Sequence, residues 1–459
     1  MLNYTDEIAN FVRELSWQDI PTDVQECAKL RILDTLGVGI FATCTPWGQI
    51  ITDFAGQYGG IGGSTLWGKC EKKISPLFAA LANGTCAHGF ELDDVHYPSI
   101  SHPGSVIVPA VLALAESLSA TGIKVLESVV VGYEVMGRIG SSIARQHLAK
   151  GFHPTGTFGT FGAAAACSKL LDLKTPQIQD AMGVAGSFAA GLAQFSVTGS
   201  MVKRIHAGQA AESGMKAAIL AKQGFTGPRE ILEGKYGFCR VFNQDPEAID
   251  WNIMMEGLGK RYVVEEISVK PSAACGVLHA VIDCIQQIQS ERPFKADDIK
   301  KITVLGHENL VHEHNVYKPD SILAAQYSLP FTVGLTVVGR IGDPRGYLDE
   351  NILRDQKILQ IAEKVTTVID EKIQSAFPKK FSAGVAILFY DGSSMEKKIY
   401  DPRGTPEHPF TQDEMKAKFR LMTREIIHEQ GIEMLLNKIK NLENVKDVNV
   451  LFEMVRLQH

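Results

Sequence analysis

Most of the helices that this sequence predicts are apolar on almost every face, and few soluble folds can accommodate such helices. Apolar residues recur at helical spacing through the first two-thirds of the chain. A helix that is apolar all round must be covered on all sides, so it belongs inside a thick helical domain and not on the surface of a thin bundle. Helices are predicted at residues 75–90, 104–119, 125–148, 156–171, 176–195 and 206–223.

The pattern changes after about residue 262. Residues 263–269 are β-branched and strand-like, residues 276–288 predict a helix, and residues 302–305 predict a second strand. A β-hairpin is predicted within residues 384–400, and charged amphipathic helices then return. The predicted fold is therefore mostly α with an inserted α/β domain. The expected boundaries are residues 1–266 and 404–459 for a large all-helical domain, and 267–403 for a smaller α/β lid domain.

One stretch, Ala181–Val202, carries no charge and is long enough to span a bilayer. It is rich in Gly, Ala and Ser and poor in Leu and Ile, so its tendency to insert is weak. We therefore interpret it as a helix buried inside the helical domain, where small residues permit close packing.

The bulk composition excludes several classes of protein. A net charge of -6 disfavours a nucleic-acid partner, which would require a clustered cationic surface. The 8 cysteines show no CxxC or Cys/His ligand spacing, so zinc and iron–sulfur sites have little support. The first residues carry acids and no apolar signal segment, so we expect reduced thiols, a cytoplasmic location and no membrane partner.

Proton carriers and cations recur in four segments that are too apolar or too rich in glycine to form ordinary surface. These segments are residues 91–104, 151–156, 202–208 and 268–275. Grouped in space, they would form a pocket for a small polyanion with acid–base groups at hand. That combination of residues indicates an enzyme.

The segment 91–104 is expected to be a loop, because its prolines interrupt any continuous helix. It leads into a fully apolar helix, and a helix N-terminus is well placed to hold an anion. The alternative is a solvated acidic loop whose histidines cap neighbouring helices. The residue types would suit a metal, but spacing within a loop gives that reading no support. The ionisable residues of this loop are Glu91, Asp93, Asp94, His96 and His102.

The other three segments each allow two interpretations. His153 is either a site residue or a satisfied core histidine, and Thr155 could equally be a helix N-cap. Lys203 either extends to water or is held in a pocket of low dielectric as an anion partner. Lys270 and Cys275 lie where the chain enters the α/β domain, a natural position for a cleft. Cys275 could be a nucleophile, although a structural thiol is the preferred reading.

Ten short motifs in order along the chain carry a family resemblance. They are STLWG (64–68), AALANGTCAHGFELDD (79–94), HPG (102–104), GYEVMGR (132–138), GFHPTGTFG (151–159), KRIHAGQAA (203–211), GFTGP (224–228), LEGKYGF (232–238), KPSAACGVLH (270–279) and DPRGTPEHP (401–409). With these motifs the chain resembles the MmgE/PrpD family, which includes 2-methylcitrate dehydratase, cis-aconitate decarboxylase and iminodisuccinate epimerase. The match extends over nearly the whole sequence.

The resemblance implies a homodimer, a cleft between a helical domain and a lid, and chemistry on small di- or tricarboxylates without a metal or other cofactor. It also implies a set of site residues. The implied catalytic residues are His102, His153, Lys203, Asp93 and Tyr317. The implied substrate-binding residues are Glu91, Arg204, His206, Lys270, Cys275 and His279.

The chain also departs from the patterns of the two well-known activities. Glu91 and Val95 stand where the decarboxylase pattern has aspartate and threonine, and Cys275 stands where it has a histidine. Residues 95–101 replace the tryptophan-containing loop of the dehydratase. These departures leave the reaction open.

The reactions of this family share the formation or quenching of a carbanion beside a carboxylate. We expect His153 and His102 to share proton transfer, with the loop of Glu91 and Asp93 orienting them. Lysines, Arg204 and protonated histidines would hold the negative charge. The predicted function is a lyase, either a dehydratase or a decarboxylase, acting on a carboxylate such as 2-methylcitrate or cis-aconitate. The alternatives are an epimerase of an iminodisuccinate-like dicarboxylate and a non-catalytic carboxylate-binding homologue.

Overall fold

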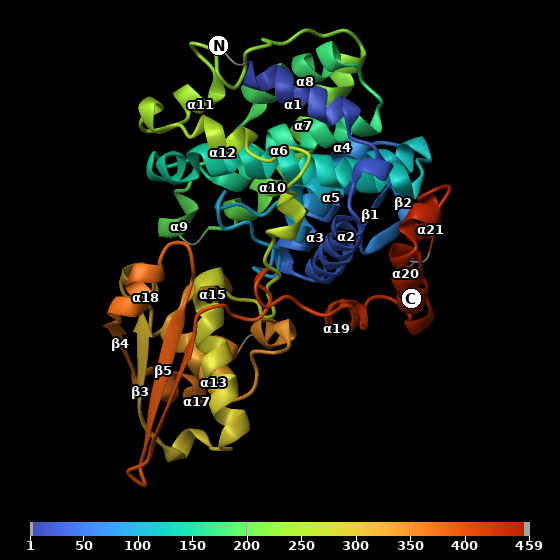
Figure 1. The fold of residues 1–459 in the computed structure, drawn as a ribbon. Helices are drawn as coiled ribbons and strands as arrows, with labels where there is room; N and C mark the ends of the chain where they lie inside the picture. The colour runs from blue at the N-terminus through green and yellow to red at the C-terminus, as the bar shows by residue number, and fades with distance from the viewer. Residues whose placement is uncertain (1–2, 199, 350, 454–459) are drawn as a thin grey trace. The chain divides into compact units, whose positions relative to one another are not determined.

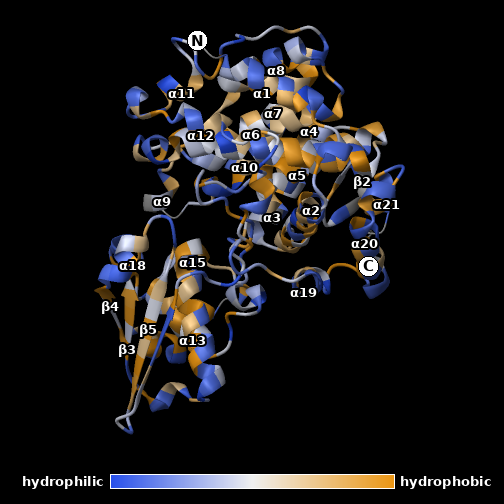
Figure 2. Ribbon diagram, viewed as in Figure 1, coloured by the Kyte–Doolittle hydropathy of each residue, from blue (hydrophilic) through white to orange (hydrophobic). Residues whose placement is uncertain are grey.

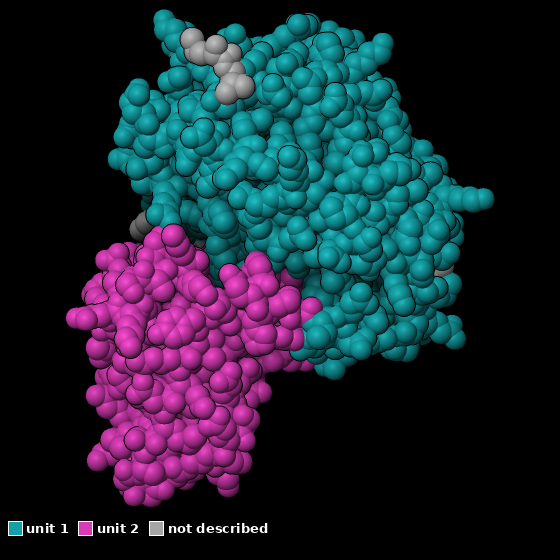
Figure 3. Space-filling view, in the orientation of Figure 1, with its two compact units in different colours: residues 1–268, 411–459 teal, residues 269–410 magenta. Residues whose placement is uncertain are grey.

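Helices make up most of the described chain, and its strands form one two-stranded and one four-stranded sheet (Figure 1). The computed structural model describes residues 3–198, 200–349 and 351–453. The prediction of a mostly α fold is confirmed. The chain divides into two units, unit 1 with residues 1–268 and 411–459, and unit 2 with residues 269–410 (Figure 3).

Unit 1 contains the long helices and a small hairpin. The hairpin strands are β1 (Ser64–Leu66) and β2 (Lys69–Ile74), which pair antiparallel and were not predicted. The helices before the inserted unit are α1 (Tyr4–Glu14), α2 (Thr22–Ala42), α3 (Pro46–Tyr58), α4 (Pro76–Ala87), α5 (Gly104–Leu118), α6 (Gly122–Ala149), α7 (Pro154–Leu170), α8 (Thr175–Phe188), α9 (Phe195–Thr198), α10 (Val202–Lys222), α11 (Phe238–Val241) and α12 (Trp251–Met255). Those after it are α19 (Gln412–Thr423), α20 (Glu429–Lys440) and α21 (Asn449–Phe452).

The core of unit 1 forms where α4, α5, α6, α7 and α10 pack on one another. Every residue of α7 is buried, and α5 is buried from Gly104 to Glu116, as expected for helices that are apolar all round (Figure 2). Close packing of α10 on α4 depends on Gly208, because a Cβ there would lie 2.0 Å from the backbone oxygen of Leu81. This contact sets the end of α4 beside the start of α10.

The uncharged stretch Ala181–Val202 is not one buried helix, and this prediction is wrong. Helix α8 ends at Phe188, and a loop follows in which Leu192 is 62% exposed. Met201 and Val202 at the start of α10 are also exposed. Among the described residues no helix is long and apolar enough to cross a membrane.

Unit 2 is built on the sheet order β4-β3-β5-β6. Strand β3 pairs parallel with β4 and antiparallel with β5, and β5–β6 form the predicted hairpin. Helix α13 packs against β5 and β6, and α16 packs against α13. The strands are β3 (Ile299–Gly306), β4 (Val365–Ile369), β5 (Ala383–Phe389) and β6 (Ser394–Ile399). The helices are α13 (His279–Glu291), α14 (Glu308–Glu313), α15 (Ile322–Tyr327), α16 (Leu329–Val337), α17 (Gln356–Ala362) and α18 (Glu371–Ala376).

The strand predicted at residues 263–269 is absent from the described structure. Val263–Glu265 form a 3₁₀ turn instead, and only Ser268 makes a single bridge, to Val95. Both valines are buried. Burial against α6 accounts for the β-branched residues that suggested a strand.

Candidate active site

The loop between α4 and α5 carries the ionisable residues predicted for the site. His88 follows the last residue of α4, and its amide donates to Gly84 O at 3.0 Å. Glu91 has φ of 56°, a left-handed conformation that costs a non-glycine residue on the order of 1–3 kcal/mol and is typical of functional loops. The predicted alternative of a solvated acidic loop is wrong, because His88, Glu91, Asp93 and Asp94 are at most 3% exposed.

Asp93 joins two histidines. Its Oδ2 lies 2.6 Å from Nδ1 of His88 and 3.2 Å from Nδ1 of His102. The Nδ1 atom of His102 also lies 2.7 Å from the backbone oxygen of Asp94. A carbonyl oxygen can only accept, so His102 carries its proton on Nδ1 and donates. An ionised Asp93 likewise requires His88 to donate from Nδ1, which leaves Nε2 of the neutral His88 ring with a lone pair.

His88 and Asp93 differ in their protonation states. It lowers the pKa of His88 to about 4, against the opposing charge of Asp93. Burial alone would raise the pKa of Asp93, but the charges and hydrogen bonds of His102 and His88 outweigh it and hold that pKa well below its ordinary value. At neutral pH the site therefore contains an ionised Asp93 held by a neutral His88.

Asp94 fulfils a different role from its neighbour. Its Oδ1 accepts the Gly104 amide of α5 at 2.9 Å, and its Oδ2 accepts the Tyr133 hydroxyl at 2.7 Å. The anion expected at the N-terminus of this helix is thus a side chain of the protein itself. Burial raises the pKa of Asp94 to about 6, and hydrogen bonds from Tyr133 and Gly104 limit the rise.

Lys203 is held in the interior of unit 1 as the partner of Glu91. The two residues form a buried ion pair, with side chains that are each 4% exposed. Lys203 therefore does not extend to water, and the structure favours the pocket interpretation. The loop of Glu91 and Asp93 was expected to orient the histidines; in the described contacts Asp93 lies against His88 and His102, and Glu91 pairs with Lys203.

Arg204 adds a second cation beside this pair. Its Nε donates to Gly89 O at 2.9 Å, and its guanidinium lies 3.9 Å from the centre of the Trp47 ring. The contact fixes Arg204 against the turn that follows His88. The cluster thus gathers residues from α3, from α10 and from the loop after α4.

His153 and His206 form a second pair of histidines. Their Nδ1 atoms are 2.9 Å apart, so one ring donates and the other accepts. The His153 ring stacks on His88 at 5.7 Å between centroids, and the His88 and His102 rings are 4.8 Å apart. His153 stands at the N-cap of α7 without a capping side-chain bond, and Thr155 instead accepts the His102 amide at 3.2 Å. The reading of Thr155 as the N-cap is therefore wrong.

Burial also affects this second pair. It lowers the pKa of His153 well below its ordinary value, with further lowering by the charges of His88, Lys203, His206 and His102. Burial and the charge of Lys203 lower the pKa of His206. The described His153 is therefore neutral at neutral pH, in contrast to the protonated histidines that the sequence suggested.

The remaining predicted residues lie in unit 2 and are described within that unit alone. Lys270 and His279 are buried, and His279 Nε2 lies 3.2 Å from Ser272 O. The Cys275 amide donates to Gln326 O at 2.8 Å. Tyr317 is 38% exposed, and its hydroxyl donates to Val365 O of β4 at 3.1 Å. Unit 1 thus brings together Glu91, Asp93, His102, His153, Lys203, Arg204 and His206.

Among the described residues, His88, Asp93 and His102 are the group with the composition of a metal site. Their ligand atoms lie within 4.8 Å of one another. Ligands of one zinc ion sit about 2.0–2.2 Å from it and so about 3 Å or more from one another. The His88–Asp93 distance of 2.6 Å is a hydrogen bond, and an ion would have to separate the two groups.

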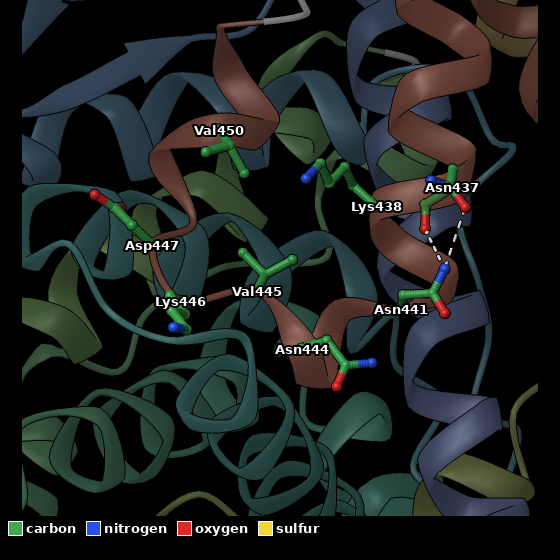
Figure 4. A pocket seen from close by; sticks show the side chains of 8 residues that line it. All are labelled: Asn437, Lys438, Asn441, Asn444, Val445, Lys446, Asp447 and Val450. Atoms are coloured by element: carbon green, nitrogen blue, oxygen red, sulfur yellow. Dashed lines mark hydrogen bonds between the residues drawn. The ribbon is translucent and has the colours of Figure 1, made fainter.

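A surface pocket in unit 1 includes none of these residues (Figure 4). Amides and two lysines dominate its wall, and its single acid is Asp447. It lacks paired acid–base groups and is not a candidate active site. The lining residues are Asn437, Lys438, Asn441, Asn444, Val445, Lys446, Asp447 and Val450.

His88 is the site residue that sequence reasoning missed. It lies within the family motif of residues 79–94, but it follows an apolar helix and precedes a glycine, without polar neighbours. Its Nε2 atom is buried and has no hydrogen-bond partner among the described residues. Membership of that motif was the only available signal.

Comparison with known proteins identifies the family of the chain. The MmgE/PrpD N-terminal domain matches residues 6–249, and the MmgE/PrpD C-terminal domain matches residues 272–444. The cis-aconitate decarboxylase-like protein oryM of Aspergillus oryzae is 30% identical over 99% of this chain and 97% of its own length. Cis-aconitate decarboxylases of Aspergillus terreus and Homo sapiens are 28% and 27% identical, over 98% of this chain and 95% and 94% of their own lengths. The chain therefore belongs to the MmgE/PrpD family.

Proposed function

We propose that the protein is a lyase that decarboxylates a small di- or tricarboxylate, with cis-aconitate as the first substrate to test. The observation that carries this proposal is the buried cluster in which Asp93 holds two histidines next to His153 and Lys203. The similarity to cis-aconitate decarboxylases over nearly the whole chain supports the same reaction class.

The proposed chemistry follows from the charges of the cluster. Loss of CO₂ leaves an electron pair on carbon, and a proton must reach that carbon from an acid. Lys203 and Arg204 would bind substrate carboxylates, and the arriving anion would favour protonation of the neutral histidines around it. His153 and His102 would then exchange protons with the substrate, which typically contributes about 10²–10⁴-fold to the rate.

Four residues of unit 2 belong to this proposal, although no described contact joins them to the cluster in unit 1. Lys270, Cys275, His279 and Tyr317 are proposed as further functional residues on the family resemblance alone. Metal independence is proposed as well, because the short His88–Asp93 distance suits a proton better than an ion.

The decisive experiment is proton NMR of the purified protein in D₂O with 2-methylcitrate, citrate, cis-aconitate and the iminodisuccinate stereoisomers. The expected result is loss of CO₂ from cis-aconitate, with one deuterium bound to carbon in each product molecule. Activity that survives a metal chelator is expected. Inactivation that added divalent ions reverse would refute the metal-free mechanism.

The panel also separates the alternatives. Loss or addition of water without CO₂ release would identify a dehydratase. Deuterium entry with inversion and no elimination would identify an epimerase, which the departures at Glu91, Val95 and Cys275 keep as the second candidate. Absence of any reaction would move the assignment to carboxylate binding.

A further inference from the structure

His88 occupies a position that neither its sequence neighbours nor the proposed chemistry explains. It is 1% exposed and donates from Nδ1 to Asp93 at 2.6 Å, closer than His102 approaches the same oxygen. Its other nitrogen, Nε2, is buried without a partner among the described residues. His307 in unit 2 also has a buried Nε2 without a described partner, so what sets His88 apart is its bond to Asp93.

The charge state of His88 suits the support of a carboxylate. A lysine or arginine in this place would hold Asp93 but would also neutralise it. A neutral imidazole fixes the carboxylate through one hydrogen bond and leaves the negative charge available to His102. Burial keeps His88 neutral at neutral pH, although Asp93 is adjacent.

The surroundings hold the His88 ring in a single place. Its ring lies between those of His102 and His153, with centroid distances of 4.8 and 5.7 Å. Its backbone is fixed as the C-terminal cap of α4. The charged and titratable groups acting on it are Asp93, Lys203, His102 and His153, the same groups that act in the proposed function.

We propose that His88 is a positioning residue, which locks the Asp93 carboxylate so that Asp93 orients His102 and sets its basicity. The inference rests on the proposed function for its activity assay. The chain of contacts is His88 Nδ1–H to Asp93 Oδ2, and Asp93 Oδ2 to His102 Nδ1–H.

The test compares His88→Asn with His88→Gln. The asparagine amide reaches the position of Nδ1 and can still donate to Asp93, whereas the glutamine amide extends to the position of Nε2 and leaves Asp93 without that donor. We expect kcat of His88→Asn to stay within a few fold of the parent. For His88→Gln we expect kcat to fall about 10–100-fold with KM nearly unchanged, since general acid–base catalysis contributes about 10²–10⁴-fold.

A second readout reports on His102 without turnover. The rate at which diethyl pyrocarbonate modifies His102, followed by mass spectrometry across pH, gives its midpoint of protonation. Loss of the His88 donor strengthens the hold of Asp93 on protonated His102, so this midpoint is expected to move to higher pH in His88→Gln and not in His88→Asn. The side chain of His102 is 14% exposed and within reach of the reagent.

The matched control is His307→Asn. His307 is also buried, and burial lowers its pKa to about 4, but it caps α14 in unit 2 through a bond from the Leu310 amide. We expect kcat of His307→Asn to stay within about twofold of the parent, as for a substitution outside the site.

Three outcomes would overturn the inference. A loss of kcat in His88→Asn as large as, or larger than, that in His88→Gln would mean that the bond from Nδ1 to Asp93 is not what the site requires of His88. An unchanged kcat in His88→Gln would mean that Asp93 needs no such support, and an unchanged His102 midpoint would remove the proposed coupling. A parent protein that turns over no substrate refutes the proposed function instead, and the modification experiment still decides the role of His88.

Discussion

His88 and His102 are held by a carboxylate, whereas His153 and His206 are held only by each other. In the first pair, Asp93 and the Asp94 carbonyl accept from Nδ1, so the site of the proton is fixed. In the second pair a single proton lies between two equivalent nitrogens 2.9 Å apart. Either ring can donate, and the pair has no fixed tautomer.

This difference separates two functions that one active site needs. A carboxylate-held histidine presents a lone pair with defined direction, which suits proton abstraction or a stable imidazolium. A histidine held by a neutral partner gains or loses a proton without breaking an ion pair. The structure thus contains two kinds of acid–base group within a single cluster. We call His88 and His102 the preset pair, because the position of each proton is fixed, and His153 and His206 the adaptable pair, because the proton can lie on either ring.

Asp93→Asn attacks the preset pair and is expected to have the largest effect. The asparagine amide is neutral and lacks the carboxylate charge that holds the Nδ1–H groups of His88 and His102. The tautomer and the orientation of His102 are therefore no longer fixed. We expect kcat to fall by about 10²–10⁴-fold. Steady-state kinetics on the substrate identified by NMR would measure this change.

The adjacent acid provides the matched control. Asp94→Asn retains an oxygen that accepts the Gly104 amide, so we expect a loss of about tenfold or less in kcat. Equal losses at the two positions would show that the loop is needed only as a folded unit and would remove the distinction between the pairs.

Lys203→Met tests the cation that acts on both pairs. The substitution removes the described ion-pair partner of the buried Glu91 carboxylate, which should cost about 3–5 kcal/mol in the free energy of unfolding. Lys203→Met combined with Glu91→Gln should recover most of that stability without recovering turnover. Lys216→Met, which breaks the more exposed Glu212 pair on the same helix, should cost about 0.5 kcal/mol or less.

Urea unfolding followed by tryptophan fluorescence measures these changes in unit 1. The 4 tryptophans, Trp17, Trp47, Trp67 and Trp251, all lie in that unit. A double variant as unstable as Lys203→Met would contradict the assignment of the cost to the loss of the ion pair between Lys203 and Glu91.

Acid should destabilise unit 1, and this is the smallest of the expected effects. Burial lowers the folded-state pKa of His88 to about 4 and lowers that of His153, so the unfolded chain binds protons first as pH falls below about 6.5. Each such histidine should lower the free energy of unfolding by roughly 1 kcal/mol per pH unit between pH 6.5 and its folded pKa.

Urea unfolding at pH 7.5, 6.5 and 5.5 would measure this slope. His153→Asn should reduce the slope by removing the contribution of the adaptable pair, while His428→Asn, at an exposed histidine, should not. A slope that His153→Asn leaves unaltered would show that other buried histidines of unit 1, such as His88 and His147, cause the acid sensitivity.

The long helices could be predicted because their apolar residues follow one period and end at glycine or proline. The gathering of His102, His153, Lys203 and Asp93 in unit 1 followed from a resemblance carried by motifs and could not be reached from spacing alone. His88 was missed because its role depends on a hydrogen bond at the end of an apolar helix. The one signal in the sequence was its place in the motif of residues 79–94.

The incorrect predictions share a physical cause. Residues 189–202 are small and uncharged, which is compatible with a buried helix and equally with an exposed loop. Val263 and Val264 are β-branched residues that are buried outside any sheet, so their burial explains why apolar residues occur there. In both segments composition describes the environment that a residue tolerates, whereas backbone conformation depends on neighbours far along the chain.

The support of the Asp93 loop by α19 has a consequence for biosynthesis. Lys418 donates to Leu92 O at 3.1 Å across 326 residues of sequence and also pairs with buried Asp34. A ribosome completes α1 to α12 and the whole of unit 2 before Lys418 is made. The bond that ties the loop of Asp93 to α19 can therefore form only after nearly all of the chain has been translated.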